Sequence, residues 1–422
     1  MIVGGGASGL LVAVNLLRKS DSCEVIMVEP NQKLGLGLAY STKDPSHLLN
    51  VPAGRMSGLV EEPLSLCEWA QVDENQFLSR QDYGKYLNSL LERELNRVDS
   101  SRFRHVKDWV TGISAEGKRY VCTLYSSGSF EADKIVLALG NSDSIVPGFF
   151  EGLPTNSRAV RDVWREEFLS NYDSVAIIGT GLTFYDIALS ILRERPSAVI
   201  HGISRNGLLP SPHLRHRAPA LPVPSDARLS AQGIRDYLSA SGDKWREAQD
   251  GIRHDLQEIW AAFPDSEKKT FIEHYFRWWN SLRHRSAPEI DEQIKSAIES
   301  RQILIHKASV NSVQQLSEGM SLELSNGEIL KVEQVINGCG NQLVSTHPLI
   351  QKLIEKKILT RGPLGYGVAC DAKTLALKDA EGKVHAGIYG IGPILVGELL
   401  ETTAIPEIRV EADLISKELL RT

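Results

Sequence analysis

The first thirty residues alternate between apolar runs and a glycine-rich turn. Residues 2–3 are apolar, residues 4–9 contain four glycines, and an almost unbroken apolar run covers residues 10–17. A second apolar run at 24–28 ends at Glu29. Short apolar runs bounded by glycines are typical of buried strands in a parallel sheet, whereas the longer run indicates a buried helix. The pattern therefore predicts a strand, a turn, a helix and a second strand.

The same order of elements recurs in the middle of the chain. Residues 174–178 predict a buried strand, residues 179–183 form a turn with two glycines, and an apolar helix face continues to Leu192 before a strand at 198–203. This alternation is typical of α/β folds with parallel sheets. The pattern further predicts helices at 83–95 and from about 402 to 419, hairpin-like strands near 104–114 and 119–125, and strands at 134–141, 303–306, 320–324, 334–340 and 387–393.

Between about residues 226 and 301 the apolar period is helical. Apolar residues recur there at i, i+4, i+7 and i+8, which places them on one face of a helix. One such face comprises Ile252, Leu256, Ile259, Trp260 and Phe263, and a second comprises Phe271, Tyr275, Trp279 and Leu282. Residues 209–225 are rich in Pro, Ser, His and Arg, which predicts a linker or loop that leads into this helical insertion.

Composition excludes several classes of protein. The chain has 422 residues, enough for two or three domains, and is 42% hydrophobic and 24% charged, as is typical of soluble globular proteins. Its net charge of −6 predicts no general affinity for nucleic acid or an anionic membrane. No apolar run approaches the roughly 20 residues of a membrane span, and no signal peptide is visible, so we expect a cytoplasmic protein. The five cysteines are scattered, which predicts neither a metal site nor a redox dithiol.

The first glycine turn has the spacing of a dinucleotide-binding motif, Gly4-x-Gly6-x-x-Gly9. Gly4 permits a tight turn, Gly6 lets a pyrophosphate approach the backbone, and Gly9 lets the helix pack closely on the strand. The helix N-terminus offers free N–H groups and a partial positive charge to phosphates. Glu29 lies roughly 20 residues further on, where a carboxylate binds both ribose hydroxyls and repels a 2′-phosphate. This stretch therefore predicts a dinucleotide site.

The second turn repeats the motif with one departure, Gly179-x-Gly181-x-x-Phe184, so we expect its helix and strand to lie farther apart. The next strand ends at Ser204 and Arg205, which suit the 2′-phosphate of NADP as a hydrogen-bond donor and a planar cation. The alternative is an exposed arginine without a ligand. Residues 277–285 mix aromatic and cationic side chains, and either line a substrate or NADP-phosphate cleft or form core with a solvated edge.

A long segment between residues 35 and 56 follows Glu29. It is too irregular in period for a helix or strand and too apolar for an ordinary surface loop. Long ordered loops of this kind often carry ligands. The alternative is a buried connection that only covers the sheet.

Taken together, these motifs resemble the two-dinucleotide-binding-domain flavoproteins, and among them the poorly characterised bacterial FAD/NAD(P)-binding proteins. The resemblance rests on four sequence motifs: Gly37-Leu38-Ala39-Tyr40, His47-Leu48-Leu49-Asn50-Val51-Pro52-Ala53, Gly179-Thr180-Gly181-Leu182-Thr183 and Thr403-Ala404-Ile405-Pro406-Glu407-Ile408-Arg409. The wider likeness is to class B flavin monooxygenases and N-hydroxylases. In their identifying stretch Trp164 fits the aromatic position, whereas Arg161 stands where those proteins have a histidine.

The resemblance implies an α/β fold with two Rossmann-like dinucleotide-binding domains, one for FAD and one for NADP, and a helical insertion. We expect the first part of the FAD-binding domain at 1–165, the NAD(P)-binding domain at 166–335 with the insertion at about 226–301, and the C-terminal part of the FAD-binding domain at 336–422.

The resemblance also implies which residues bind each cofactor. The last helix would approach the flavin with its N-terminus, with Thr402 or Thr403 as its cap and Pro406 in its first turn. In these proteins a Gly-Asp pair usually precedes it, and Gly392-Pro393 stands there instead. The residues expected at FAD are Gly4, Gly6, Ser8, Gly9, Glu29, Ala39, Tyr40, His47, Asn50, Met56, Val110, Gly140, Gly392, Thr402, Ala404 and Ile405, and those expected at NADPH are Gly179, Gly181, Leu182, Thr183, Ser204 and Arg205.

The function implied is an FAD- and NADPH-dependent oxidoreductase, foremost an N-hydroxylase-like monooxygenase that uses O2 and a flavin C4a-peroxide on a small nucleophilic substrate. Asn50 is the candidate catalytic amide at the flavin–nicotinamide contact, or else a loop-capping residue. His47, His213 and His284 are further candidates that structural roles explain equally well. An NAD(P)H:acceptor reductase and a non-enzymatic flavin-binding accessory protein are the alternatives, and a homo-oligomer is left open.

Overall fold

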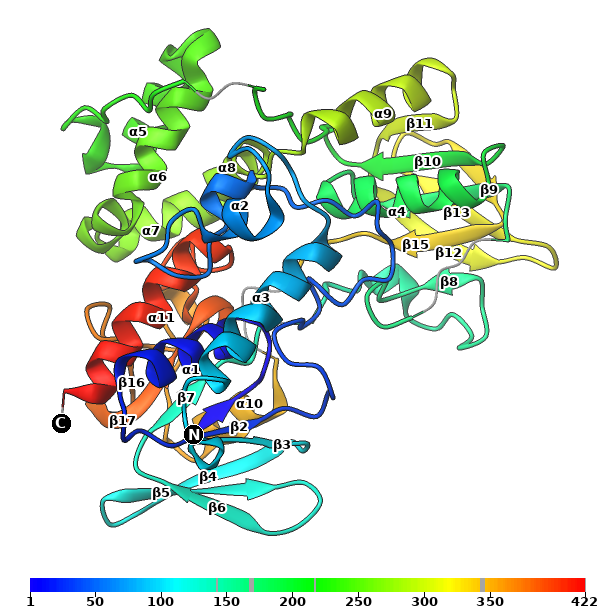
Figure 1. Ribbon diagram of the computed structural model, residues 1–422. Coiled ribbons are helices and arrows are strands. Elements are labelled where there is room, and N and C mark those ends of the chain that lie inside the picture. The colour runs from blue at the N-terminus through cyan, green and yellow to red at the C-terminus, as the bar shows by residue number, and fades with distance from the viewer. Residues whose placement is uncertain (142, 167–170, 216–217, 342–345, 422) are drawn as a thin grey trace.

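The computed structural model describes residues 1–141, 143–166, 171–215, 218–341 and 346–421. Two parallel sheets, each covered by helices, lie at the lower left and right of the molecule, and a helical insertion lies above the first (Figure 1). The expected α/β architecture with two Rossmann-like units is confirmed. Among the described residues, no helix combines the length and apolar character needed to cross a bilayer.

The first sheet has the strand order β16-β17-β7-β1-β2-β3, and its strands are parallel except for β16. Helix α1 packs between α3 and α11, and all three share one apolar core with the sheet (Figure 1). The strands are β1 (Ile2–Val3), β2 (Val25–Val28), β3 (Phe103–Val106), β7 (Ile135–Leu137), β16 (Ala376–Lys378) and β17 (Val384–Gly390). The helices on this side are α1 (Ala7–Lys19), α2 (Ser65–Ala70), α3 (Arg80–Leu95), α10 (Pro348–Glu355) and α11 (Ile405–Leu420).

The second sheet has the order β11-β10-β9-β15-β8, all parallel. Successive residues of a strand face opposite sides, so β9 contributes Val175 and Ile177 to one core, with α4 and α9, and Ala176 and Ile178 to another. The elements here are β8 (Ala159–Val160), β9 (Ser174–Ile178), α4 (Leu182–Glu194), β10 (Val199–Ser204), α9 (Pro288–Glu299), β11 (Ile303–Lys307) and β15 (Gln334–Asn337).

Two small antiparallel sheets complete the fold, β4-β5-β6 and β12-β13-β14. The prediction of one hairpin-like strand near 104–114 was wrong. The chain turns at Asp108, whose carboxylate accepts hydrogen bonds from the Trp109 N–H (2.7 Å) and the Ser126 hydroxyl (2.5 Å), so β3 joins the parallel sheet and β4 pairs with β5. The strands are β4 (Val110–Glu116), β5 (Arg119–Leu124), β6 (Ser129–Ala132), β12 (Val310–Gln315), β13 (Met320–Leu324) and β14 (Ile329–Val332).

The helical insertion forms an apolar core of its own. Both expected helix faces point into it, with Trp260 and Trp279 fully buried, and a π-helical turn at Phe271–Tyr275 interrupts the second face. Its helices are α5 (Ala231–Ala240), α6 (Trp245–Ala262), α7 (Asp265–Thr270) and α8 (Phe276–Arg283). Leu400, from the segment before α11, completes this core, so the insertion is packed onto the first sheet's half of the molecule.

Phe184, the departure in the second glycine motif, has a partner in the neighbouring strand. Its side chain is fully buried, and a Cβ added to Gly202 of β10 would lie 2.8 Å from its ring. The missing side chain at Gly202 therefore provides the space that the phenylalanine ring fills.

We predict that Gly202→Ala lowers the free energy of unfolding by about 1–3 kcal/mol because the new methyl group collides with Phe184. Phe184→Ala alone should cost about 3–5 kcal/mol, but the double variant should be more stable than the sum of the two losses, since each change relieves the other. Urea unfolding measures all three. Gly148→Ala is the control, because nothing lies within 4 Å of a Cβ added there; strict additivity of the two losses would contradict the packing described.

Candidate functional site

The first glycine turn brings backbone groups closer together than any side chain would allow. Gly4 has a φ of +100°, and a Cβ added to it would lie 2.2 Å from the Ala138 carbonyl oxygen. A Cβ added to Gly9 would lie 2.0 Å from the Gly4 carbonyl oxygen. The N-cap of α1 is Gly6, which has no side chain to occupy the N–H groups of the first helical turn. The turn therefore fits a dinucleotide pyrophosphate, which needs free N–H groups and close backbone approach.

Glu29 is held at the edge of this turn by its neighbours. One carboxylate oxygen accepts a hydrogen bond from the Gly5 N–H (2.8 Å), and the other accepts from the backbone (3.0 Å) and side-chain (2.6 Å) N–H groups of Asn31. A carboxylate has about four lone-pair sites, so the oxygen that accepts from Gly5 still has one for a ribose hydroxyl, whereas Asn31 occupies both sites of the other oxygen.

The second turn repeats this geometry at the end of β9. Gly179 has a φ of +104°, and its added Cβ would lie 2.7 Å from the Gly338 carbonyl oxygen, as Gly4 does against Ala138. The N-cap of α4 is Gly181, and nothing lies within 4 Å of a Cβ added there. Leu182 and Thr183 open α4. A second dinucleotide phosphate fits here for the same reasons as at the first turn.

Ser204 and Arg205, the residues expected at a 2′-phosphate, differ in their surroundings. The Ser204 hydroxyl lies 2.8 Å from the Thr180 hydroxyl and accepts the Gly207 N–H at 3.1 Å, so it ties its own turn to the second glycine turn. Arg205 is exposed directly after β10. Of the pair, the arginine is therefore the side chain open to a phosphate.

The C-terminal segment comes back to the first turn. Gly392 has a φ of +75°, and a Cβ there would lie 3.2 Å from the Ser8 hydroxyl oxygen. The expected threonine cap of α11 was wrong: Ala404 is the N-cap. The fully buried Thr402 hydroxyl instead lies 3.1 Å from the Gly392 carbonyl oxygen and 2.5 Å from a carboxyl oxygen of Glu411.

Glu411 is a residue of this site that the sequence interpretation missed. It is almost fully buried, and burial raises the pKa of its carboxyl to about 7. The signal that reveals it is an acid inside the apolar stripe of α11, beside Ala412 and between Ile408 and Ile415, all three of which are buried.

The long loop after Glu29 passes over the first turn. Gly37 lies against Gly6, because a Cβ on Gly6 would be 3.6 Å from the Gly37 Cα. The Tyr40 ring packs against that of Tyr83 of α3 at a tilt of 55°, with ring centroids 4.7 Å apart, and Ala39 is exposed. The remaining cofactor candidates fall into two groups: Met56 and Val110 are buried, and Gly140, at φ +73°, has nothing within 4 Å of an added Cβ.

His47 belongs to this loop and connects it to the other half of the molecule. Its Nδ1 is 2.8 Å from the Thr42 hydroxyl and its Nε2 is 2.8 Å from the Ser190 hydroxyl on α4. Both ring nitrogens therefore have protein partners, and the structure places this residue at the junction between the loop and α4.

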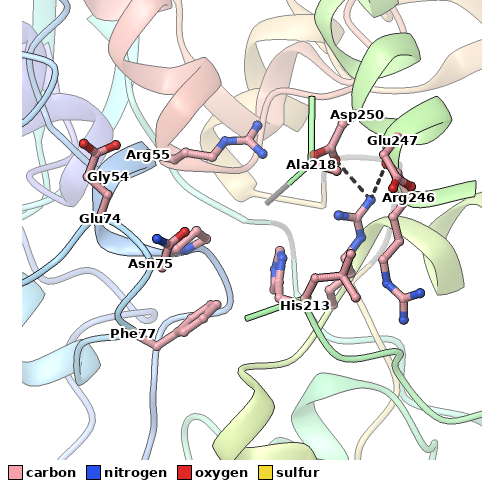
Figure 2. Close-up of a pocket in the computed structure, with 13 residues that line it drawn as sticks. Gly54, Arg55, Glu74, Asn75, Phe77, His213, Ala218, Arg246, Glu247 and Asp250 are labelled. Carbon is pink, nitrogen blue, oxygen red and sulfur yellow. Dashed lines mark hydrogen bonds and ion pairs between the residues drawn. The ribbon is translucent and has the colours of Figure 1, made fainter. Parts of the chain in front are cut away.

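Asn50, the candidate catalytic residue, adjoins a pocket. The backbone carbonyl oxygen of Asn50 accepts a hydrogen bond from Nε2 of His213 at 2.9 Å. His213 lines a pocket of about 130 Å³, to which Arg285 also contributes. Figure 2 shows one wall with Gly54, Arg55, Glu74, Asn75 and Phe77, and the other with Arg246, Glu247 and Asp250 of α6. Arg55 extends from the first wall toward the second (Figure 2).

The walls of the pocket carry both signs of charge. Arg285 is 5% exposed and forms an ion pair with Asp250 at 3.0 Å (Figure 2). Within the described part of the chain, its Nε is buried without a hydrogen-bond partner, and so is one carboxyl oxygen of Glu247. The charged residues of the lining are Arg55, Arg246, Arg285, Glu74, Glu247 and Asp250. The stretch 277–285, for which two roles were open, thus contributes Trp279 to the core and Arg285 to the pocket.

Two further expected residues lie away from the pocket lining. Trp164 lies under the guanidinium of Arg80, 5.9 Å from its ring centroid, and Arg80 is paired with Asp186 of α4 at 2.7 Å. Burial lowers the pKa of His284 well below its usual value.

Among the described residues, no group of three or more His, Cys, Asp or Glu side chains is arranged to hold a metal ion.

Comparison with known proteins agrees with this geometry. Residues 1–142 match the sequence model of a family described as FAD-NAD(P)-binding, and no curated protein matches the chain. The fold is similar to ornithine hydroxylase PvdA of Pseudomonas aeruginosa in its reduced form (TM-score 0.66, 14% identity, 99% of this chain and 98% of that chain).

Two other solved structures are comparably similar. They are the ornithine N-hydroxylase KtzI of Kutzneria sp. 744, with reduced FAD, NADP+ and L-ornithine (TM-score 0.66, 15% identity, 100% of this chain and 98% of that chain), and L-lysine 6-monooxygenase of Pseudomonas syringae (TM-score 0.65, 15% identity, 100% and 98%). Because the sequence identities are 14–15%, this likeness shows only that the chain shares the fold of these proteins.

We predict that His213 makes stability depend on pH. Burial lowers its pKa from 6.5 to about 4, so between these values the unfolded chain binds a proton that the folded chain does not. Stability is then full above pH 6.5 and falls as the pH drops toward 4. His213→Gln keeps a donor for the Asn50 carbonyl but cannot titrate, so it should lose less stability over this window than the wild type in urea unfolding. The exposed His254 serves as the control, as His254→Gln; equal slopes for wild type and His213→Gln would contradict the prediction.

Proposed function

We propose that this chain is an FAD- and NADPH-dependent oxidoreductase, and specifically a monooxygenase that hydroxylates the nitrogen of a small amine. The observation that carries the proposal is the pair of equivalent glycine turns, Gly4–Gly9 and Gly179–Phe184, at the ends of two parallel sheets. One turn is followed by an acid and the other by an arginine, which suits two different dinucleotides. The same proposal includes the expected three-part division of the chain, with its boundaries before β8 and after β15 instead of at 165 and 335, because both strands pair within the second sheet.

Each turn has a defined task in this proposal. The N–H groups at the start of α1 bind the FAD pyrophosphate, and Glu29 accepts a ribose hydroxyl. The start of α4 binds the NADPH pyrophosphate, with Arg205 against its 2′-phosphate. Reduced flavin supplies the activation of O2 and the transfer of one oxygen atom. The chain's own contribution is to bind, orient and shield these groups.

The pocket beside Asn50 is the proposed substrate site. It begins two residues after Asn50 and is connected to it by His213. The unpartnered carboxyl oxygen of Glu247 suits an ammonium group, and the Arg285 Nε suits an anionic group. A volume of about 130 Å³ limits the ligand to a small molecule. Ornithine and lysine, named for the similar enzymes, combine these two kinds of charge.

We predict that the purified protein binds FAD and oxidises NADPH slowly in air, and that a small amine with a carboxyl group speeds this oxidation and gains about 16 Da. NADH should be a poorer donor because it lacks the phosphate for Arg205. The measurements are absorbance at 340 nm and product mass. Turnover that needs an added acceptor but no O2 would indicate the reductase, and flavin that NADPH does not reduce would indicate the accessory protein; either outcome overturns the proposal.

We also predict that Glu247→Gln raises the KM of the stimulating amine by about tenfold or more, because the charge on the carboxylate is lost. NADPH oxidation without substrate should not change. Glu258→Gln is the matched control, since Glu258 lies on the same helix with a side chain that is 79% exposed. An unchanged KM in Glu247→Gln would remove this pocket from the proposal and leave the cofactor sites standing.

A further inference from the structure

Glu411 connects α11 to the segment that precedes it and, through Gly392, to the first glycine turn at the other end of the sequence. It lies on α11, and both oxygens of its carboxyl group have partners. One accepts the Gly392 N–H at 2.8 Å, and the other lies 2.5 Å from the Thr402 hydroxyl oxygen. Gly392 in turn lies against Ser8 of the first glycine turn. The carboxyl group therefore holds the C-terminal segment against the expected site of the FAD pyrophosphate.

The central position of this connection favours glycine. Gly392 has a positive φ of +75°, and its α-carbon faces both the Ser8 hydroxyl and the Thr402 carbonyl oxygen. A shift of the Gly392 backbone would therefore change its packing against the Ser8 hydroxyl. The backbone N–H that Glu411 accepts is the group that fixes Gly392 in place.

The Thr402 hydroxyl can report the protonation state of Glu411. It lies within hydrogen-bonding distance of both the Glu411 carboxyl and the Gly392 carbonyl, yet it has one proton to donate. When Glu411 is ionised, Thr402 donates to it. When Glu411 is protonated, Glu411 donates to Thr402, and Thr402 is free to donate to Gly392.

The surroundings of Glu411 favour proton uptake near neutral pH. The pKa of this carboxyl is raised to about 7. Burial is the largest cause, the hydrogen bonds from Thr402 and Gly392 offset part of the rise, and the carboxylate of Glu407 on the same helix adds a smaller one. Glu411 also acts on the Cys370 thiol. Burial is the main cause that raises the pKa of this thiol, and the negative charge of Glu411 adds to the rise.

We propose that Glu411 is a positioning residue of the FAD site, which holds Gly392 and Thr402 against Ser8 and takes up a proton when the dinucleotide binds. The inference rests on the proposed FAD site. An ionised Glu411 opposes the negative charge of a pyrophosphate, so the protonated form binds FAD more tightly. By linkage, FAD affinity falls as the pH rises above about 7.

The experiment is a titration of apoprotein with FAD from pH 6 to pH 8.5, followed by the quenching of flavin fluorescence. The wild-type Kd should be constant near pH 6 and rise above pH 7, by up to about tenfold per pH unit. Glu411→Gln, which mimics the protonated carboxyl, should bind FAD tightly with no rise over this range. Glu411→Ala, which loses both contacts, should raise the Kd about tenfold even at pH 6.

Two controls separate this role from a general loss of structure. Glu418→Gln, on the same helix, should follow the wild-type profile, and far-ultraviolet circular dichroism should be the same for all variants. Equal pH profiles for wild type and Glu411→Gln would overturn the inference while FAD binding stands. Wild-type protein that binds no FAD at any pH would overturn the proposed function and this inference with it.

Discussion

The structure depends on the close approach of backbone to backbone at the first glycine turn. A methyl group on Gly4 or Gly9 would lie within about 2 Å of a carbonyl oxygen, so β1, α1 and the end of β7 can meet only because these side chains are missing. The same contact is made at Gly179, against Gly338 at the end of β15. Two strand ends and one helix start thus converge twice in the chain, and each convergence leaves backbone N–H groups facing outward.

Polar contacts join the two halves of the molecule, beside the apolar packing of Leu48 and Phe77 on the core of the second sheet. The long loop and α3 reach α4 through His47 with Ser190 and through Arg80 with Asp186. These side chains are mostly buried, and a buried charge is stable only when it is paired. Hydrogen bonds and ion pairs require defined distances and angles, whereas apolar contacts do not. These contacts therefore restrict the relative position of the two halves more than apolar packing does.

The helical insertion is joined to the C-terminal segment by a buried carboxylate. Glu401 accepts a hydrogen bond from Trp279 and is paired with Arg253 and Arg283 of the insertion. The same insertion supplies the α6 wall of the pocket. Its position therefore depends on a segment that begins at Gly392 and ends at α11, so the proposed substrate pocket and the proposed flavin site share one stretch of chain.

Local pattern determined most of the fold. The apolar runs, the two glycine motifs and the helical period at 252–263 each depend on neighbouring residues, and the structure confirms them. The spacing of Gly4, Gly6 and Gly9 is sufficient for the turn, because the contacts it permits lie within that turn and the strands beside it. What tertiary structure alone decided are pairings that no local periodicity predicts: Gly202 with Phe184, Thr402 with Glu411 instead of a helix cap, and His213 with Asn50. The sequence gives the identity of each residue but not the distance between two residues in the folded protein. The period of apolar residues therefore cannot show which two buried polar groups form a hydrogen bond.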